Sequence, residues 1–163
     1  MPTPSQKFFQ NGKIHSYESF GTLDGPGIRL VVFFAGCPLR CKYCHNIDVV
    51  YCHEAQCDPE TVMKEIIKNK PYFLSSGGGV TISGGDPLGQ PFFLAEFLKR
   101  CHAENIHTAV DTSMMTCKKH IDMIAPYTDL WLISLKHFES QTHKFLTDCP
   151  NEPILENIQY LSK

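Results

Sequence analysis

The chain has 163 residues, of which 42% are hydrophobic and 20% are charged, and this is enough for one globular domain with a real core. The net charge is −2 and the basic residues are scattered, which disfavours nucleic acid and anionic membranes as partners. The longest apolar run, Leu30 to Ala35, is too short for a membrane span, and residues 1–10 lack the features of a signal peptide. We therefore expect a cytoplasmic protein, in which grouped cysteines indicate a metal or catalysis rather than disulfides.

Short β-rich runs alternate with amphipathic stretches along the chain, which is typical of βα units and a parallel sheet. Strands are predicted at residues 30–34, 80–83, 107–111 and 129–135. Helices are predicted from about residue 58, from Pro91, and over residues 118–125, 141–147 and 153–161. The first is predicted to place Val62, Met63, Ile66 and Ile67 on one face, and the second to turn Leu94, Phe97, Leu98 and Cys101 inward. Four βα units result, whereas a closed eight-unit barrel needs about 250 residues. We therefore predict an α/β fold in a single domain over residues 1–163, either an open partial barrel or a parallel sheet covered by helices.

Three cysteines follow the first predicted strand with the spacing C-x3-C-x2-C, at Cys37, Cys41 and Cys44. Iron–sulfur clusters take thiolate ligands, and three thiolates can hold three irons of a [4Fe–4S] cube and leave the fourth iron open. An open coordination position is typical of a catalytic metal centre. Zinc is a weaker alternative, because a structural zinc site needs a fourth ligand, which His45 could supply. Inert thiols are the remaining alternative.

The element C-x3-C-x-aromatic-C after a first strand resembles the radical S-adenosylmethionine (SAM) superfamily. In that superfamily the amino and carboxylate groups of SAM chelate the open iron. An electron from the reduced cluster then splits SAM into methionine and a 5′-deoxyadenosyl radical. The resemblance implies a partial, open (β/α) barrel. It also implies that Tyr43 lies against the adenine and that Cys44 and His45 border the cofactor. The alternative for Tyr43 is an ordinary packing aromatic.

Upstream of the first strand, Asp24-Gly25-Pro26-Gly27-Ile28-Arg29 resembles the D-G-P-G-I-R element of the glycyl-radical-enzyme activating family. The Gly-Pro-Gly sequence predicts a turn whose backbone can approach another chain closely. The resemblance implies that Asp24, Gly25, Pro26 and Gly27 contact the glycine loop of a partner enzyme.

The second predicted strand ends in Ser83-Gly84-Gly85-Asp86-Pro87, which resembles the G-G-E element of the superfamily. The resemblance implies that Gly84, Gly85 and Asp86 receive the amino group of the methionine part of SAM. Asp86 replaces the commoner Glu and has a shorter reach. Aspartate also stands there in the activases of anaerobic ribonucleotide reductase. The alternative is an ordinary turn between a strand and a helix.

Two further motifs end the third and fourth predicted strands, and both depart from the family. Asp111 opens a segment that resembles D-T-N-G, but Met114 stands where the family has glycine. The segment Ser134-Leu135-Lys136 resembles D-L-K, with serine in place of aspartate. The resemblance implies that Asp111, Ser134, Leu135 and Lys136 border the cofactor, although Lys136 could also be an ordinary surface lysine. Because the family's two aspartates help hold a monovalent cation, the loss of one puts that cation in doubt.

All four motifs follow strand ends, and ligands bind at the carboxyl ends of parallel strands in such folds. We therefore predict a glycyl-radical-enzyme activase without an acid–base residue, in which the SAM-derived radical removes hydrogen from a glycine. The expected partners are a glycyl radical enzyme such as pyruvate formate-lyase and an electron donor such as flavodoxin or ferredoxin. An activase of anaerobic ribonucleotide reductase is the first alternative. A non-catalytic iron–sulfur or SAM-binding module or fragment is the second, because the family continues for two further βα units.

Overall fold

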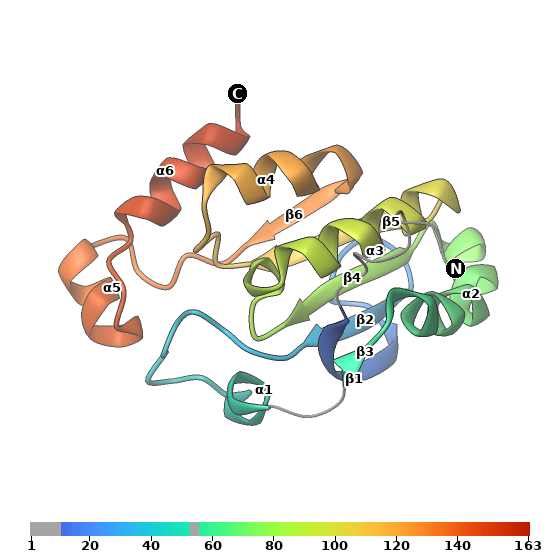
Figure 1. The fold of residues 1–163 in the computed structure, drawn as a ribbon, viewed down its shortest axis with the longest axis horizontal. Coiled ribbons are helices and arrows are strands. Elements are labelled where there is room, and N and C mark those ends of the chain that lie inside the picture. Colours follow the sequence, from blue (N-terminus) through green and yellow to red (C-terminus); the bar gives the residue numbers. More distant parts are fainter. Residues whose placement is uncertain (1–10, 53–55) are drawn as a thin grey trace, which may run out of the picture.

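A single six-stranded sheet forms the centre of the computed structural model, which describes residues 11–52 and 56–163 (Figure 1). The strand order is β3-β1-β2-β4-β5-β6, and the bounds are β1 Gly12–Gly21, β2 Arg29–Phe34, β3 Gln56–Cys57, β4 Gly79–Gly84, β5 His107–Thr112 and β6 Leu130–Ile133. The last four strands in that order, β2, β4, β5 and β6, run parallel, whereas β1 pairs antiparallel with β2 and β3. The sheet is open, and β3 and β6 are its outermost strands.

Helices connect the parallel strands. Their bounds are α1 Ile47–Tyr51, α2 Pro59–Ser76, α3 Pro91–Ala103, α4 Lys118–Ile124, α5 Ser140–Thr147 and α6 Glu152–Leu161, with short 3-10 turns η2 Pro87–Gly89 and η3 Ala125–Tyr127. The pairs β2–α2, β4–α3, β5–α4 and β6–α5 are the four predicted βα units, so the predicted α/β fold with a partial, open barrel is confirmed. Among the described residues, no helix combines the length and apolarity needed to cross a membrane.

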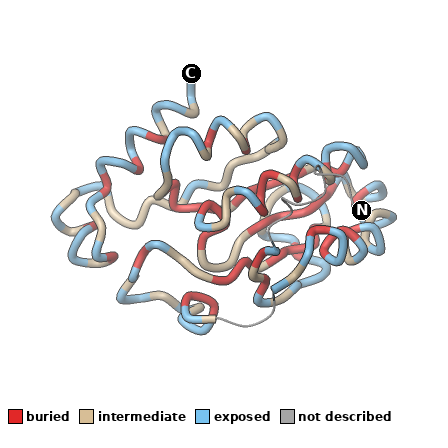
Figure 2. The backbone as a smooth tube through the Cα atoms, viewed as in Figure 1, coloured by how far each residue is buried: buried red, intermediate tan, exposed pale blue. Residues whose placement is uncertain are grey.

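The core lies between the central strands and a layer of helices, where Figure 2 shows the buried backbone. The residues predicted to face inward from α3 are all 0% exposed: Leu94, Phe97, Leu98 and Cys101. In α2, Val62 and Ile66 are also fully buried, but Ile67 is 41% exposed. Ile67 lies about 140° around the helix from Val62, because each residue turns the helix by about 100°. The prediction that Ile67 faces inward was therefore wrong.

The antiparallel strand β1 is the main element that the sequence pattern did not predict. Its side chains after Ile14 are polar or half exposed over most of its length, and only Gly21 at its end is buried. An antiparallel strand can have one face in water, so it lacks the continuous apolar run that marks a buried parallel strand. By contrast, five of the six residues of β2 are buried, and that strand was predicted.

The register of the parallel strands determines where the predicted site lies. Phe34 pairs with Gly84, and Thr112 at the end of β5 pairs with Ile133 at the end of β6. The segments that follow these strands therefore leave the sheet at one edge. This edge carries the cysteine loop (residues 37–44) and the three other motifs that end strands.

Candidate cluster and cofactor site

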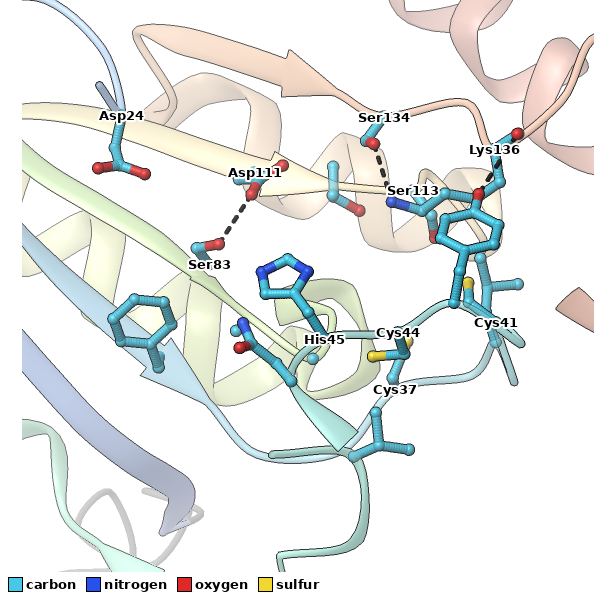
Figure 3. Close-up of a pocket in the computed structure, with 18 of the residues that line it drawn as sticks. Asp24, Cys37, Cys41, Cys44, His45, Ser83, Asp111, Ser113, Ser134 and Lys136 are labelled. Carbon is cyan, nitrogen blue, oxygen red and sulfur yellow. Dashed lines mark hydrogen bonds between the residues drawn. The ribbon is translucent and has the colours of Figure 1, made fainter. Parts of the chain in front are cut away.

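A cavity of about 580 Å³ opens at this edge of the sheet (Figure 3). Its volume is within the roughly 300–1,000 Å³ typical of sites for small molecules and cofactors. The residues predicted for the site that line it are Asp24, Cys37, Cys41, Tyr43, Cys44, His45, Gly84, Gly85, Asp111, Ser134 and Lys136. Asp86, Leu135 and the turn 25–27, which were also predicted for the site, do not line this cavity.

The cysteine loop is held in place by the end of α5, far along the chain. The backbone N–H of Arg40 donates to the carbonyl of Thr147 at 2.9 Å, and that of Lys42 donates to the carbonyl of Leu146 at 2.8 Å. Within the loop, Nη1 of Arg40 donates to the carbonyl of Cys37 at 2.5 Å. Leu39, also in the loop, is buried and lines the cavity. The three thiols are therefore presented by a loop whose backbone is bonded on both sides of Cys41.

The three thiols line the cavity, and the surroundings of Cys37 and Cys41 affect the protonation of these two. Burial raises the pKa of Cys37 to about 11. Burial also raises the pKa of Cys41, against the opposing positive charge of Lys136. Thiols in this state are neutral near pH 7, and they become thiolates when a metal displaces their protons.

The chemistry of three thiols suits an iron–sulfur cluster, whose iron takes thiolate ligands. Over residues 11–52 and 56–163, no three His, Cys, Asp or Glu side chains converge in a way that would hold one metal ion. A [4Fe–4S] cube makes a different demand, because each thiolate binds a separate iron. Cys37, Cys41 and Cys44 all line the same cavity, which leaves room beside them for a cofactor.

The pair Gly84-Gly85 joins the end of β4 to the base of the cysteine loop. The backbone N–H of Gly85 donates to the carbonyl of Phe34 at 2.9 Å, and that of Asp86 donates to the carbonyl of Gly36 at 2.9 Å. A Cβ on Gly85 would lie 2.0 Å from the carbonyl oxygen of Gly36. Gly84 has φ +107°, in the region that favours glycine. The two glycines therefore allow a backbone contact that a side chain would prevent.

The side chain of Asp86 is directed into the protein interior. Its carboxylate is 1% exposed and accepts hydrogen bonds from the backbone of Leu88, from Thr112 Oγ1 and from both the N–H and the hydroxyl of Ser113. Burial raises the pKa of Asp86, and the same hydrogen bonds oppose that rise. The acid thus contacts the loop after β5.

Asp111, Ser134 and Lys136 face the cavity from the ends of β5 and β6 (Figure 3). Ser83 Oγ donates to Asp111 Oδ2 at 2.7 Å, and Lys136 Nζ donates to Ser134 Oγ at 2.8 Å. Tyr43 OH donates to the carbonyl of Lys136 at 3.4 Å. Asp111 and Lys136 thus place a carboxylate and an ammonium group on the walls of the same cavity, where a zwitterionic ligand could pair with both.

Asp24 reaches the cavity because a buried arginine holds its turn against the sheet. Arg29 is 0% exposed, and it donates to Thr81 Oγ1 at 2.5 Å and to the carbonyl of Pro26 at 3.0 Å. Thr81 Oγ1 in turn donates to the carbonyl of Asp24 at 2.7 Å. Burial lowers the pKa of Arg29 to about 10, so the guanidinium stays charged at neutral pH. The turn 24–27 is therefore part of the folded domain.

Several lining residues were not predicted from the sequence. They include Glu18, Phe33, Leu39, Ser83, Thr112 and Ser113. Phe33 and Ser83 could have been found from the alternation of side chains along a strand, because residues two apart share a face. Glu18 could not, because it belongs to β1, which has no strong strand signal.

Met114 stands where the family has glycine, and its backbone has a left-handed conformation that is unfavourable for a residue with a side chain. It has φ +63° and its side chain is fully buried in the core. Met114→Ala should destabilise the protein by about 2–5 kcal/mol through the lost packing. Met114→Gly loses the same packing but relieves a left-handed backbone that costs roughly 1–2 kcal/mol. The glycine variant should therefore be about 1 kcal/mol more stable than the alanine variant in urea unfolding.

Met63 is the matched control for this comparison. It is also a buried methionine, at 9% exposure, but it lies inside α2. There the alanine variant should be the more stable one, by about 1 kcal/mol, because glycine is unfavourable within a helix. The same order of stability at both positions would show that the backbone of Met114 is not strained.

Comparison with known proteins identifies the family of this chain. The family model of the radical SAM superfamily matches residues 31–163. The chain is 43% identical over 159 residues to a pyruvate formate-lyase-activating enzyme from Staphylococcus epidermidis, which covers 93% of this chain and 63% of that protein. It is 47% identical over 137 residues to the pyruvate formate-lyase-activating enzyme of Clostridium pasteurianum, covering 83% of this chain and 57% of that protein. The chain thus spans about three-fifths of the length of these relatives.

A solved structure supports the fold. The crystal structure of Streptococcus suis SuiB bound to the precursor peptide SuiA is similar with a TM-score of 0.64. The sequence identity is 19%, and the likeness covers 85% of this chain and 31% of that one. The matched family model includes the cysteine loop, the Gly-Gly-Asp segment and the ends of β5 and β6, which are the segments that build the cavity. The chain belongs to the radical SAM superfamily.

Proposed function

We propose that this protein is a glycyl-radical-enzyme activase of the pyruvate formate-lyase type. One observation carries the proposal: the three thiols and the polar groups that end β4, β5 and β6 line a single cavity. Identities of 43% and 47% to curated pyruvate formate-lyase-activating enzymes support the choice of family branch. A [4Fe–4S] cluster on Cys37, Cys41 and Cys44 would supply the electron that cleaves SAM.

The side chains around the cavity divide the binding of SAM between them. The amino group of its methionine part is placed between Asp111 and the backbone of Gly84-Gly85. Its carboxylate is placed near the ammonium group of Lys136. Tyr43, with His45 nearby, is placed along the adenine. In each case a fixed group of this chain meets a group of opposite charge or matching polarity.

The reaction needs one electron and one hydrogen atom. The added electron breaks a carbon–sulfur bond of SAM, which leaves methionine and a 5′-deoxyadenosyl radical. That radical takes a hydrogen atom from the α-carbon of a glycine in the partner and becomes 5′-deoxyadenosine. The glycine radical is stabilised by its two flanking amide groups, and no side chain blocks the approach. The chain's own residues hold SAM in place and keep the reacting carbon away from water.

The partner glycine is proposed to approach past the turn 24–27. Asp24 lines the cavity, and the neighbouring Leu23 side chain is 95% exposed. The Leu23 side chain is therefore available for contact with another protein. A flavodoxin or ferredoxin as electron donor and a cytoplasmic location complete the proposal. The proposal includes no monovalent cation. In the family two aspartates help hold this cation, but here Ser134 stands in place of one of them and accepts a hydrogen bond from the Lys136 ammonium group.

Anaerobic reconstitution tests this proposal on the 163-residue chain. The protein is loaded with iron and sulfide, reduced with dithionite and mixed with SAM, and 5′-deoxyadenosine is measured. We expect a cluster spectrum and 5′-deoxyadenosine that depends on reductant. Absence of a cluster would refute the enzyme proposal, and a cluster without 5′-deoxyadenosine would favour the binding-module alternative.

The partner is tested in a second step. The reduced, SAM-loaded protein is incubated with pyruvate formate-lyase or with anaerobic ribonucleotide reductase, and a glycyl radical is sought by electron paramagnetic resonance (EPR). We expect the radical on pyruvate formate-lyase. A radical on the reductase alone would instead favour the alternative that shares Asp86 at the Gly-Gly-Asp segment.

A further inference from the structure

We infer that Asp86 is a positioning residue, whose carboxylate joins the loop after β4 to the loop after β5 and so sets the shape of the SAM cavity. The hydrogen bonds that its carboxylate accepts from Leu88, Thr112 and Ser113 are called the Asp86 network below. The consequence for SAM binding rests on the proposed function, whereas the network itself does not.

Asp86 is buried, and its carboxylate makes its hydrogen bonds inside the protein. The residue is 1% exposed and is absent from the lining of the cavity. In the described part of the chain, no Lys, Arg or His forms an ion pair with it. Burying a carboxylate without a countercharge is costly unless hydrogen bonds compensate. Here four uncharged hydrogen-bond donors compensate for the buried charge, so the Asp86 carboxylate constrains the positions of these donors.

Three of the four donors belong to the end of β5 and to the residue that follows it. Thr112 Oγ1 donates to Asp86 Oδ1 at 2.8 Å, and the N–H of Ser113 donates to Asp86 Oδ2 at 3.0 Å. The hydroxyl of Ser113 donates to the same oxygen. Both oxygens of one carboxylate thus hold two consecutive residues, which leaves that segment little freedom to rotate.

The network also supports the left-handed residue that follows. Thr112 Oγ1, while donating to Asp86, accepts a hydrogen bond from the N–H of Met114 at 2.9 Å. Met114 has φ +63°, which is unfavourable for a residue with a side chain. Asp86 is therefore linked through Thr112 to the left-handed backbone conformation of Met114.

The same arrangement places Asp111 in the cavity. Neighbouring side chains of a strand point to opposite faces, so Thr112 directed at Asp86 leaves Asp111 directed at the other side. Asp111 lines the cavity and accepts a hydrogen bond from Ser83 Oγ at 2.7 Å. On the β4 side, the N–H of Asp86 donates to the carbonyl of Gly36, at the base of the cysteine loop. One residue thus connects the segments that carry the thiols and Asp111.

Hydrogen exchange in the cluster-free protein tests the network without any cofactor. Amide exchange at Ser113 and Met114 is compared in the unaltered protein, Asp86→Asn, Thr112→Val and Thr112→Ser. Asn cannot accept at both positions, and Val removes the hydroxyl that links Asp86 to Met114. Exchange should be at least about tenfold faster at Ser113 in Asp86→Asn and at Met114 in Thr112→Val. Thr112→Ser should restore the slow exchange of Met114. Unchanged exchange in Asp86→Asn and Thr112→Val would overturn the inference.

SAM binding to the reconstituted protein tests the consequence. Equilibrium dialysis and the change that SAM causes in the EPR spectrum of the reduced cluster should show about tenfold weaker binding for Asp86→Asn and for Thr112→Val. Thr112→Ser should bind as the unaltered protein does, and the iron content should be equal in all. Asp58→Asn is the matched control, because Asp58 also accepts from a backbone N–H and a hydroxyl, those of Thr61 at the start of α2.

Two outcomes would separate the inference from the proposed function. If Asp86→Asn weakens SAM binding but Thr112→Val does not, the carboxylate acts on SAM directly and the inference is wrong. If the unaltered protein forms a cluster but does not bind SAM, the proposed function fails, and the exchange rates alone then support or overturn the Asp86 network.

Discussion

Replacement of Cys41 by alanine is expected to abolish 5′-deoxyadenosine formation. Each thiolate of the cysteine loop would hold a separate iron, so the loss of one thiolate would leave an iron that no protein side chain binds. Changes to residues that hydrogen-bond to metal ligands typically lower metal affinity or activity by about 10- to 100-fold, and the loss of a ligand itself should lower them further. The measurement is iron content and 5′-deoxyadenosine after anaerobic reconstitution. Thermal unfolding of the cluster-free protein should change little, because the Cys41 side chain is only half buried.

Cys149 supplies the control for this prediction. Its sulfur lies 4.0 Å from the carbonyl of Pro38 in the same loop, so it is a thiol of similar location outside the motif. Cys149→Ala should retain the cluster and its activity. The assignment of Cys41 as a ligand would be wrong if Cys41→Ala kept its activity, or if both variants lost it equally.

Gly85→Ala should unfold more easily and should assemble less cluster. The added Cβ would lie 2.0 Å from the oxygen and 2.6 Å from the carbon of the Gly36 carbonyl. These are backbone atoms next to Cys37, so relief requires the base of the cysteine loop to move. Overpacking that shifts backbone costs typically 1–3 kcal/mol, and we expect about 3 kcal/mol here because two backbone hydrogen bonds are lost as well. Denaturant unfolding measures the first effect, and iron incorporation measures the second.

Gly89 is the matched glycine for that experiment. It lies four residues further on, in η2, and a Cβ there would have no atom within 4 Å. Gly89→Ala should change the free energy of unfolding by no more than about 0.5 kcal/mol. A loss of stability similar to that of Gly85→Ala would mean that the contact with Gly36 is not the cause.

The sequence by itself was sufficient for the parts of this protein whose signal is local. Most residues of β2 and β4 are buried, and α3 has the spacing of an amphipathic helix, so these elements can be recognised along the chain. The cysteine spacing and the placement of motifs after strands are local in the same sense. These features yielded the α/β fold and the edge at which the site lies.

Long-range contacts decided the rest. β1 has few buried side chains, and its pairing with β2 rests on backbone hydrogen bonds that no pattern records. The bonds from the cysteine loop to Leu146 and Thr147 join residues more than one hundred positions apart. The direction of the Asp86 side chain depends on two hydroxyl residues, Thr112 at the end of β5 and Ser113 directly after it. A residue type and its spacing determine which chemistry is possible, but only the packing of distant segments determines which group each side chain meets.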